Sequence, residues 1–371
     1  VLVLDQSPSD PPIQPEPVRV SALNIASQNI LTALGVWNSL SAEIKTPFEK
    51  IEVWDATGRG HLKFEAASIG IEQLGHIVSN PGICATLHQA INEHPNTSII
   101  WADAITECVT SENKITVLTE NGRTINSQLL VGSDGAKSKI RKLANIEHEA
   151  NSYQQVAIVA SVTTSKPHGS CARQRFLETG PLAFLPISNN QCSIVWSSDL
   201  EEANRLLMLS DTAFSEALAA AFNYELGSIE SVSLRRSFPL ARQHAKRYIG
   251  DRIALIGDAA HTVHPLAGLG ANQGISDAAA LSQIINARHS ENRDFSTRSV
   301  LRRYERWRSS ENAFLLDTID SLQKCFGIQN PVVSRARSAG LNLTDRSDIL
   351  KRNLMHHAIG FGGQTPLLAQ K

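Results

Sequence analysis

One stretch, residues 252–277, constrains the fold more than any other part of this 371-residue chain. It reads RIALIGDAAHTVHPLAGLGANQGISD and begins with an apolar run at 253–256 that is typical of a buried strand. We expect the strand to end at Gly257-Asp258, where a residue without bulk and then a hydrogen-bond acceptor can meet a ligand. After a loop, residues 271–288 are predicted to form a helix, whose N-terminal N–H groups would face an electron-rich ligand.

A second motif of strand and turn lies earlier in the chain. The predicted strand 128–131 leads into Gly-Ser-Asp-Gly-Ala-Lys-Ser at 132–138, and Arg141 follows. Taken alone, this motif is equally consistent with any turn between a strand and a helix in which an Asp caps the helix. Its combination with residues 252–277 favours a nucleotide-binding fold.

The chain begins Val-Leu-Val-Leu-Asp, a pattern that predicts a strand ending at Asp5. In a dinucleotide-binding βαβ unit, an acidic residue at the end of the second strand binds the ribose hydroxyls. The first strand and its GxGxxG loop would lie about 20 to 30 residues earlier, so we expect the chain to be N-terminally incomplete. The alternative is that Asp5 is an ordinary acid at a strand end.

The other segments alternate between helical and β patterns. An amphipathic helix is predicted after Arg19, and another begins at Asn80-Pro81, with Asn80 as its N-cap. Residues 56–60 are flanked by two strands of a predicted hairpin, and the pattern becomes mainly β from Tyr153. The apolar faces expected to be buried comprise Leu23, Ala26, Ile30, Leu31 and Leu34 in the first helix, and Cys84, Leu87 and Ile91 in the second.

Composition excludes several classes of function. A hydrophobic content of 42% and a formal net charge of −1 describe a globular protein without an extended nucleic-acid surface. The five cysteines are odd in number and lack CxxC spacing, which favours reduced thiols in a cytoplasmic protein over disulfides or a metal site. No apolar run approaches the ~18 residues of a membrane-spanning helix.

Both motifs resemble the flavin-binding motifs of class A flavoprotein monooxygenases. Further phrases are similar to the ubiquinone-biosynthesis hydroxylases, most of all to the branch that acts on 2-octaprenylphenol: RVSALNIAS, LGVW, EVWD, LGHIVSN, LLVGSDGAKSKIR, GPLAFLP, SIVWS and GDAAHTVHPLAGLGAN. The resemblance implies an α/β fold like that of para-hydroxybenzoate hydroxylase. In this fold a Rossmann-like FAD-binding domain is interleaved with a β-sheet substrate domain, and the C-terminus is helical.

The implied domain boundaries follow the same pattern. The FAD-binding domain would comprise residues 1–75, with an inserted hairpin, then 76–150, and then 246–295, which contains the GD motif. The substrate-binding sheet would comprise residues 151–245. A C-terminal helical region would comprise residues 296–371.

The resemblance also implies the cofactor and the reaction. Reduced FAD would react with O2 at ring carbon C4a, and the distal oxygen of the hydroperoxide would be transferred to an aromatic carbon. The implied partners are a polyprenylated phenol, O2, a transient NAD(P)H or other electron donor, and a ubiquinone-biosynthesis protein complex. Because the substrate is almost insoluble, peripheral membrane contact through the helix at 350–359 is one hypothesis; packing of that helix on its own domain is slightly favoured.

Roles for individual residues follow from the resemblance. Asp5 would hold the adenosine ribose, and Arg19 would lie near the diphosphate or ribityl chain of FAD. Asn80 would approach the ribityl chain or the ring edge. Asp134 would support the nucleotide fold, while Gly257 and Asp258 would meet the pyrophosphate and ribityl hydroxyls. The residues expected to border the isoalloxazine ring are Pro265, Gly268, Gly270, Ala271 and Asn272.

The chain departs from the family pattern at two positions, with Leu269 where Gln is usual and Ser79 where Glu is common. Leu269 retains the main-chain amide but loses any contact made by Gln. Ser79 puts in question a polar contact near the ring.

Other candidates have competing interpretations. His261 and His264 have no Asp, Glu or Cys at ligand spacing, so structural roles near the flavin are favoured over a metal site. Phe184 and Trp196 are candidates for an apolar substrate pocket, although packing in the sheet core is the favoured alternative. No catalytic residue is assigned, because proton abstraction from a phenol requires no particular type of base.

Two other functions compete with hydroxylation of a polyprenylated phenol. One is flavin chemistry on another substrate: an aromatic hydroxylase of a soluble phenol, an epoxidase or a reductase. The other is a non-catalytic, flavin-free fragment or assembly subunit.

Overall fold

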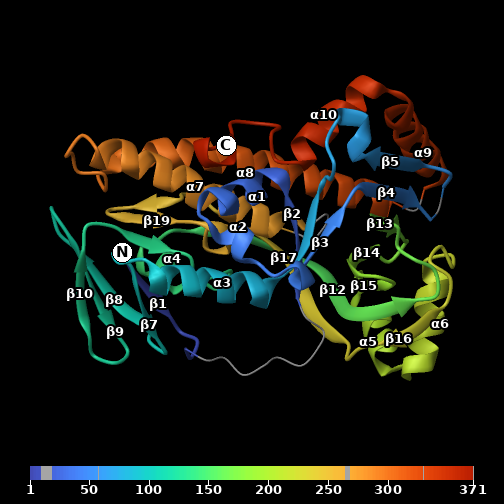
Figure 1. Ribbon diagram of the computed structural model, residues 1–371, viewed down its shortest axis with the longest axis horizontal. Coiled ribbons are helices and arrows are strands. Elements are labelled where there is room, and N and C mark those ends of the chain that lie inside the picture. The colour runs from blue at the N-terminus through green and yellow to red at the C-terminus, as the bar shows by residue number, and fades with distance from the viewer. Residues whose placement is uncertain (10–18, 57, 264–267, 329, 371) are drawn as a thin grey trace.

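The computed structural model describes residues 1–9, 19–56, 58–263, 268–328 and 330–370 (Figure 1). Its largest element is a nine-stranded sheet in which β20, β17, β12, β15, β14, β13, β4 and β5 are neighbours in that order, and β16 also pairs with β12. The central strands β12 (His148–Thr164), β15 (Gln191–Asp199), β14 (Pro181–Ser188) and β13 (Cys171–Phe176) pair in antiparallel fashion. The class predicted from the sequence, mixed α/β with a large β-sheet region, is confirmed.

Alternating apolar residues of this sheet form a core beneath two helices. Helix α5 (Leu200–Met208) begins at Asp199, whose side chain accepts a hydrogen bond from the Glu202 amide at 2.9 Å. Helix α6 (Asp211–Ala221) begins at Ser210, which accepts from the Ala213 amide at 3.2 Å. These caps satisfy N–H groups that have no partner within the helix. Strand β16 (Ile229–Val232) follows.

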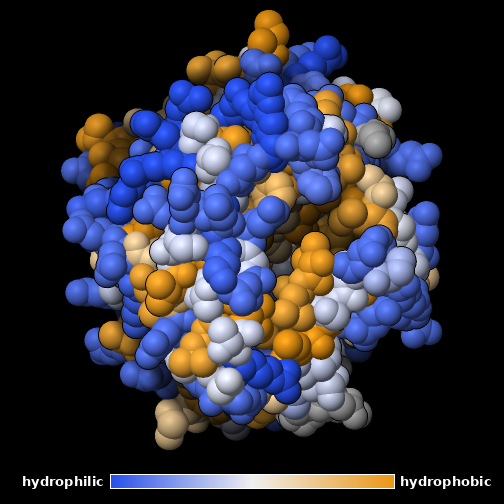
Figure 2. Space-filling view, turned by 90° about the vertical axis from the view of Figure 1, so that its left-hand side faces the viewer, coloured by the Kyte–Doolittle hydropathy of each residue, from blue (hydrophilic) through white to orange (hydrophobic). Residues whose placement is uncertain are grey.

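The opposite end of the molecule in Figure 1 contains the strands that carry the two motifs. Strand β11 (Leu130–Gly132) pairs in parallel with β19 (Ile253–Leu255), and β18 (Ile249–Gly250) pairs antiparallel with β19. A second parallel pair joins β1 (Leu2–Asp5) to β7 (Ser98–Trp101). The antiparallel strands β8 (Ile105–Thr110), β9 (Ile115–Thr119) and β10 (Thr124–Ser127) project beyond them. Figure 2 shows this end as mainly hydrophilic, with hydrophobic residues around a hollow.

The large sheet is connected to the Gly257-Asp258 (GD) motif through strands β17 and β20. Strand β17 (Arg236–Ala245) pairs with both β12 and β20 (His261–Thr262), and β20 directly follows the turn after β19. The two sides of the molecule are therefore joined at the end of the GD motif.

A three-stranded sheet of β2 (Val20–Asn24), β6 (Gly75–Ser79) and β3 (Lys45–Phe48) corrects one prediction. The helix expected directly after Arg19 is a strand over its first five residues, because these pair with β6. Helix α1 (Ile25–Ala33) follows, and then the short α2 (Val36–Ser39). Leu34, predicted to be buried, is exposed beyond the end of α1.

Helix α3 (Asn80–Glu93) begins where predicted, but its cap differs. The N-cap is Ser79, whose hydroxyl accepts from the Gly82 amide at 3.3 Å, and Asn80 is the first helical residue. Cys84, predicted to be buried, is exposed, while Leu87 and Ile91 are half-buried. The helix lies at the molecular surface, so its apolar stripe is only partly covered.

Two long helices, α7 (Leu269–His289) and α8 (Arg298–Gly327), pack side by side. Helix α9 (Pro331–Arg346) packs on the predicted hairpin of β4 (Lys50–Asp55) and β5 (His61–Glu65). There the buried Arg337 and Asp55 form an ion pair at 2.7 Å. The hairpin, which the sequence analysis assigned to residues 1–75, joins the large sheet through parallel pairing of β4 with β13.

Helix α10 (Asp348–Ala358) packs on the body of the protein through the buried Met355, with Ile359 buried at its C-cap. It nevertheless leaves Ile349, Leu350 and Leu354 exposed by 75%, 45% and 46%. In the part of the chain that the structure describes, no helix is both long enough and apolar enough to span a bilayer.

Candidate cofactor site

Arg19 lies near both the turn that follows β19 and the start of α3, and Asp5 lies against α3, with its Oδ2 3.9 Å from His88 Nε2. Asp5 ends β1, Arg19 precedes β2, Asn80 begins α3, and Asp258 lies in the 3₁₀ turn Gly257–Ala259. The Asn80 amide donates to the Arg19 carbonyl at 2.9 Å. Burial raises the pKa of both Asp258 and Cys84, and the positive charge of Arg19 opposes both rises. The negative charge of Asp5 raises the pKa of Cys84 further. The structure therefore brings these predicted residues into one region.

Asp258 lies at the edge of this region. Its side chain is exposed to solvent, yet burial by the surrounding protein raises the pKa of its carboxyl group, against the opposing charges of His261 and Arg19. The carboxylate can therefore be reached from solvent, although neighbouring protein surrounds it. It is available as a hydrogen-bond acceptor for a ligand.

The Asn80 side chain has an unsatisfied hydrogen-bond acceptor. Its side-chain Oδ1 is buried and has no partner among the described residues. Leaving such an acceptor unsatisfied costs about 1–3 kcal/mol, which a donor on a bound ligand would recover.

Among the described residues, no side chain caps the N-terminus of α7. A Cβ on Gly270 would meet no atom within 4 Å, and Ala271 is exposed. Free N–H groups at a helix N-terminus suit phosphate or another electron-rich group. Together with the acceptors at Asp258 and Asn80, they fit the hydroxyl and phosphate groups of a dinucleotide cofactor such as FAD.

Two glycines of the motif are required by the backbone. Gly257 has φ +57°, and a Cβ on it would lie 3.7 Å from the Cα of Gly274. Gly268 has φ +62°, and a Cβ there would lie 2.9 Å from the Ala22 Cβ. Both positions adopt the left-handed conformation that favours glycine. Pro265 and His264 lie outside the described residues.

Asp134 binds the first amides of a helix whose N-cap is Ser138. Its Oδ2 accepts from the amides of Lys139 and Ile140 at 2.7 and 3.0 Å, at the start of α4 (Lys139–Leu143). Its Oδ1 accepts from the Ser138 hydroxyl at 2.5 Å. These bonds hold the turn after β11 in shape, so Asp134 serves the fold beside the candidate site.

Asn272, expected to border the flavin ring, is buried and engaged within the protein. Its Oδ1 accepts from the Asn24 amide at 3.0 Å and the Ser27 hydroxyl at 2.8 Å. Its Nδ2 donates to the carbonyls of Ala22 at 2.7 Å and Gly268 at 3.2 Å. The side chain therefore ties α7 to the junction of β2 and α1, and offers no free group to a ligand.

His261 belongs to a buried ionic cluster that the sequence analysis missed. Its Nε2 lies 2.6 Å from Oδ2 of Asp277, and Oδ1 of Asp277 accepts from Arg308 Nε at 2.7 Å. The sequence signal for this cluster was Asp277, a charged residue on the apolar face of the predicted helix 271–288. The described residues contain no group of three or more His, Cys, Asp or Glu side chains able to hold a metal ion.

Phe184 and Trp196 lie in the core between the large sheet and helices α5 and α6. Phe184 stacks on Phe222 with ring centroids 4.1 Å apart, and Trp196 lies 6.0 Å from Phe214. Both rings are almost completely buried. The structure thus places them where the core interpretation expected them.

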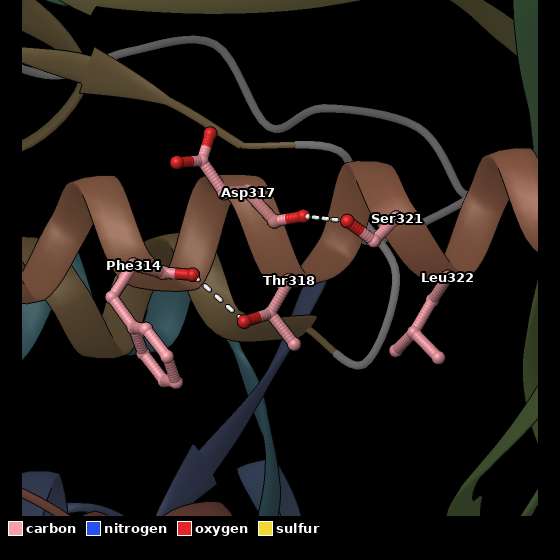
Figure 3. Close-up of a pocket in the computed structure, with 5 residues that line it drawn as sticks. All are labelled: Phe314, Asp317, Thr318, Ser321 and Leu322. Carbon is pink, nitrogen blue, oxygen red and sulfur yellow. Dashed lines mark hydrogen bonds between the residues drawn. The ribbon is translucent and has the colours of Figure 1, made fainter.

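Two cavities lie away from these residues. One, of about 410 Å³, opens along a face of α8 and is lined by Phe314, Asp317, Thr318, Ser321 and Leu322 (Figure 3). Its two hydroxyls bond within the helix, from Thr318 to the Phe314 carbonyl at 2.8 Å and from Ser321 to the Asp317 carbonyl at 2.7 Å. Another, of about 450 Å³, has a largely basic lining at the start of α8. Neither contains a predicted cofactor residue.

Comparison with known proteins gives these residues a context. A family model described as "FAD binding domain" matches residues 9–316. The chain is 31% identical to 3-demethoxyubiquinol 3-hydroxylase of Escherichia coli K12, over 94% of this chain and 88% of that protein. It is 32% identical to ubiquinone hydroxylase UbiL of Rhodospirillum rubrum, over 92% and 79%. Its fold is similar to p-nitrophenol 4-monooxygenase PnpA of Pseudomonas putida, with TM-score 0.76, 14% identity, and 98% and 92% coverage.

Proposed function

This chain belongs to the FAD binding domain family and is an FAD-dependent monooxygenase, and from that premise we propose that it hydroxylates the aromatic ring of a polyprenylated phenol in ubiquinone biosynthesis. The observation that carries the proposal is similarity along nearly the whole chain to two hydroxylases named for ubiquinone or its precursors. The proximity of Arg19 to Asn80 and Asp258, and of Asp5 to helix α3, supports it.

We assign these residues to FAD binding. Asp5 and Asp258 are acceptors suited to the hydroxyls of the cofactor, and Arg19 is a cation suited to its phosphates. The buried Oδ1 of Asn80 would accept a hydrogen bond from the cofactor. When bound, FAD supplies the redox chemistry that activates O2 for transfer of one oxygen atom to the ring.

The protein contributes position and surroundings. The N-terminus of α7, which no side chain of the described residues caps, carries the positive end of the helix dipole and would stabilise negative charge near it. An electron donor such as NAD(P)H would bind transiently. Holding the phenol in line and excluding water complete the protein's part in the reaction.

A long isoprenoid tail requires the enzyme to meet its substrate at a lipid surface or a lipid-carrying complex. The exposed apolar residues Ile349, Leu350 and Leu354 of α10 lie close in the sequence to the cations Lys351 and Arg352. This combination is typical of helices that lie in the membrane interface. We therefore assign peripheral membrane contact to α10.

The test is oxygen incorporation by the FAD-loaded protein. Enzyme, NADH or NADPH and ¹⁸O2 are incubated with a polyprenylated phenol and, separately, with the same phenol lacking the chain. We expect one ¹⁸O atom in the prenylated product, formed at least tenfold faster than from the unprenylated phenol. Hydroxylation of the unprenylated phenol alone would instead assign the enzyme to another aromatic substrate.

A further inference from the structure

Asp277 is a fully buried carboxylate in α7 that binds four groups. Its Oδ2 accepts from the main-chain amide of Gly257 at 3.0 Å and lies 2.6 Å from His261 Nε2. Its Oδ1 accepts from Arg308 Nε at 2.7 Å and from Asn312 Nδ2 at 3.2 Å. One oxygen thus faces the turn after β19, and the other faces α8.

The Oδ1 side is firmly anchored. Arg308 is almost completely buried and also donates to Gln273 Oε1 at 2.7 Å and to Asn312 Oδ1 at 3.2 Å. Asn312 in turn donates to the Tyr248 hydroxyl at 3.3 Å. These bonds set the orientation of the Asp277 carboxylate relative to two packed helices.

The free-energy cost of burying these charges indicates that the cluster positions the groups around it. A buried ion pair is often no more stabilising than apolar residues of the same shape, because both charges lose their hydration. Its advantage is directional: the carboxylate accepts bonds only at defined places. Here one of those places is the amide of Gly257, at φ +57° in a turn of three residues.

We propose that Asp277 is a positioning residue for the FAD site. Its Oδ2 holds the turn Gly257–Ala259, and with it Asp258, while its Oδ1 fixes that turn to α8 through Arg308. Loss of the Oδ2 bonds would let the turn change its orientation, and the acceptor at Asp258 would move. The inference rests on the proposed role of Asp258 in holding FAD.

The test separates charge balance from position. Asp277→Leu alone leaves the buried Arg308 without its counter-charge, so both folding and FAD binding are expected to fail. The double variant Asp277→Leu/Arg308→Met removes both charges and restores the thermal midpoint of the apoprotein toward the wild-type value. We still expect its dissociation constant for FAD, measured by fluorescence titration, to rise at least tenfold, because no acceptor remains for the Gly257 amide.

A matched variant on the other side of the carboxylate is the control. Asn312→Leu removes the Asn312 bonds to Oδ1, Arg308 and Tyr248 but leaves both Oδ2 bonds and the Arg308 ion pair, so it is expected to lower the thermal midpoint while leaving FAD affinity within threefold. Should the double variant not fold, Asp277→Glu keeps the charge and displaces the carboxylate, and the same tenfold loss is expected. Wild-type FAD affinity in a folded double variant, or in Asp277→Glu, would overturn the proposal.

Asp258→Ala distinguishes failure of the inference from failure of the proposed site. If it weakens FAD binding while the double variant does not, the cofactor site stands and the role of Asp277 falls. If Asp258→Ala binds FAD like the wild type, the assigned cofactor site is wrong, and the positioning role falls with it.

Discussion

Arg141 donates from Nη1 to the main-chain oxygen of Ala259 at 2.8 Å, and so joins the turn after β11 to the turn after β19. Its Nη2 donates to the Ala136 carbonyl, also at 2.8 Å. The two strands are parallel neighbours, with Gly132 opposite Leu255, so both turns lie at the same edge of the sheet. One buried guanidinium therefore makes the two motifs a single unit.

Replacing this guanidinium should destabilise the fold. Arg141→Met leaves two carbonyl oxygens without their charged donors, and each such bond contributes about 1.5–3 kcal/mol. We expect urea denaturation to show a loss of about 3 kcal/mol. Lys142→Met, an exposed neighbour in the same helix, should change stability by less than about 0.5 kcal/mol. A loss at Arg141 no greater than at Lys142 would contradict the bridging role.

Asn272→Ala should also lower the free energy of unfolding. The substitution leaves the Asn24 amide, the Ser27 hydroxyl and the Ala22 carbonyl without this partner in the interior, at about 1 kcal/mol or more each. A loss of about 3 kcal/mol in urea denaturation is expected. Asn286→Ala, on the exposed face of the same helix, is the control. Equal stability of the two variants would show that the Asn272 contacts contribute little.

His76 should make the protein sensitive to acid. Burial, and secondarily Lys45, lower the pKa of its imidazole from 6.5 to about 4. Between these values the unfolded chain binds a proton that the folded chain does not, so stability falls as pH falls from 6.5, and the cost is complete below about pH 4. Its size is about 3 kcal/mol, at 1.36 kcal/mol per pH unit.

The check on His76 is unfolding at pH 7 and at pH 4.5. His76→Leu should lose less stability between the two pH values than the wild type does. His356→Leu, at an exposed position in α10, should follow the wild type. A His76→Leu profile parallel to that of the wild type would rule out this histidine as the source of acid sensitivity.

Asn80→Ala should weaken FAD binding with little effect on the fold. The buried Oδ1 has no partner in the described residues, so its removal costs the apoprotein no hydrogen bond. Loss of one buried bond to the cofactor corresponds to about a tenfold rise in the dissociation constant, at 1.4 kcal/mol per tenfold. Flavin fluorescence titration measures it, with the exposed Gln89→Ala of the same helix as control. Unchanged affinity would place the cofactor away from Asn80.

The exposed apolar residues of α10 should carry membrane contact. Deletion of this segment is a poor test, because Met355 and Ile359 belong to the core. Ile349→Glu/Leu350→Glu/Leu354→Glu alters exposed positions instead, and co-sedimentation with anionic vesicles should fall at least fivefold. The control is Val109→Glu/Leu118→Glu on strands β8 and β9, also exposed. Equal losses from both sets, or from neither, would remove α10 as the contact.

Those parts of the fold that depend on residues adjacent in the sequence could be predicted from the sequence. The strand before Gly257, helix α7 and the hairpin of β4 and β5 carry periodic patterns or turn residues that favour one local structure. The family motifs likewise pointed to Asp5, Arg19, Asn80 and Asp258, which the structure brings together.

Only the tertiary structure decided how some side chains are used. Residues 20–24 are apolar enough for either helix or strand, and pairing with β6 makes them a strand. Asn272 lies in a cofactor motif, but partners far away in the sequence occupy its amide. Asp277 meets His261 from 16 residues away and Arg308 from another helix. Local patterns determine which elements form, whereas hydrogen bonds and burial between distant segments determine which polar groups remain free for a ligand.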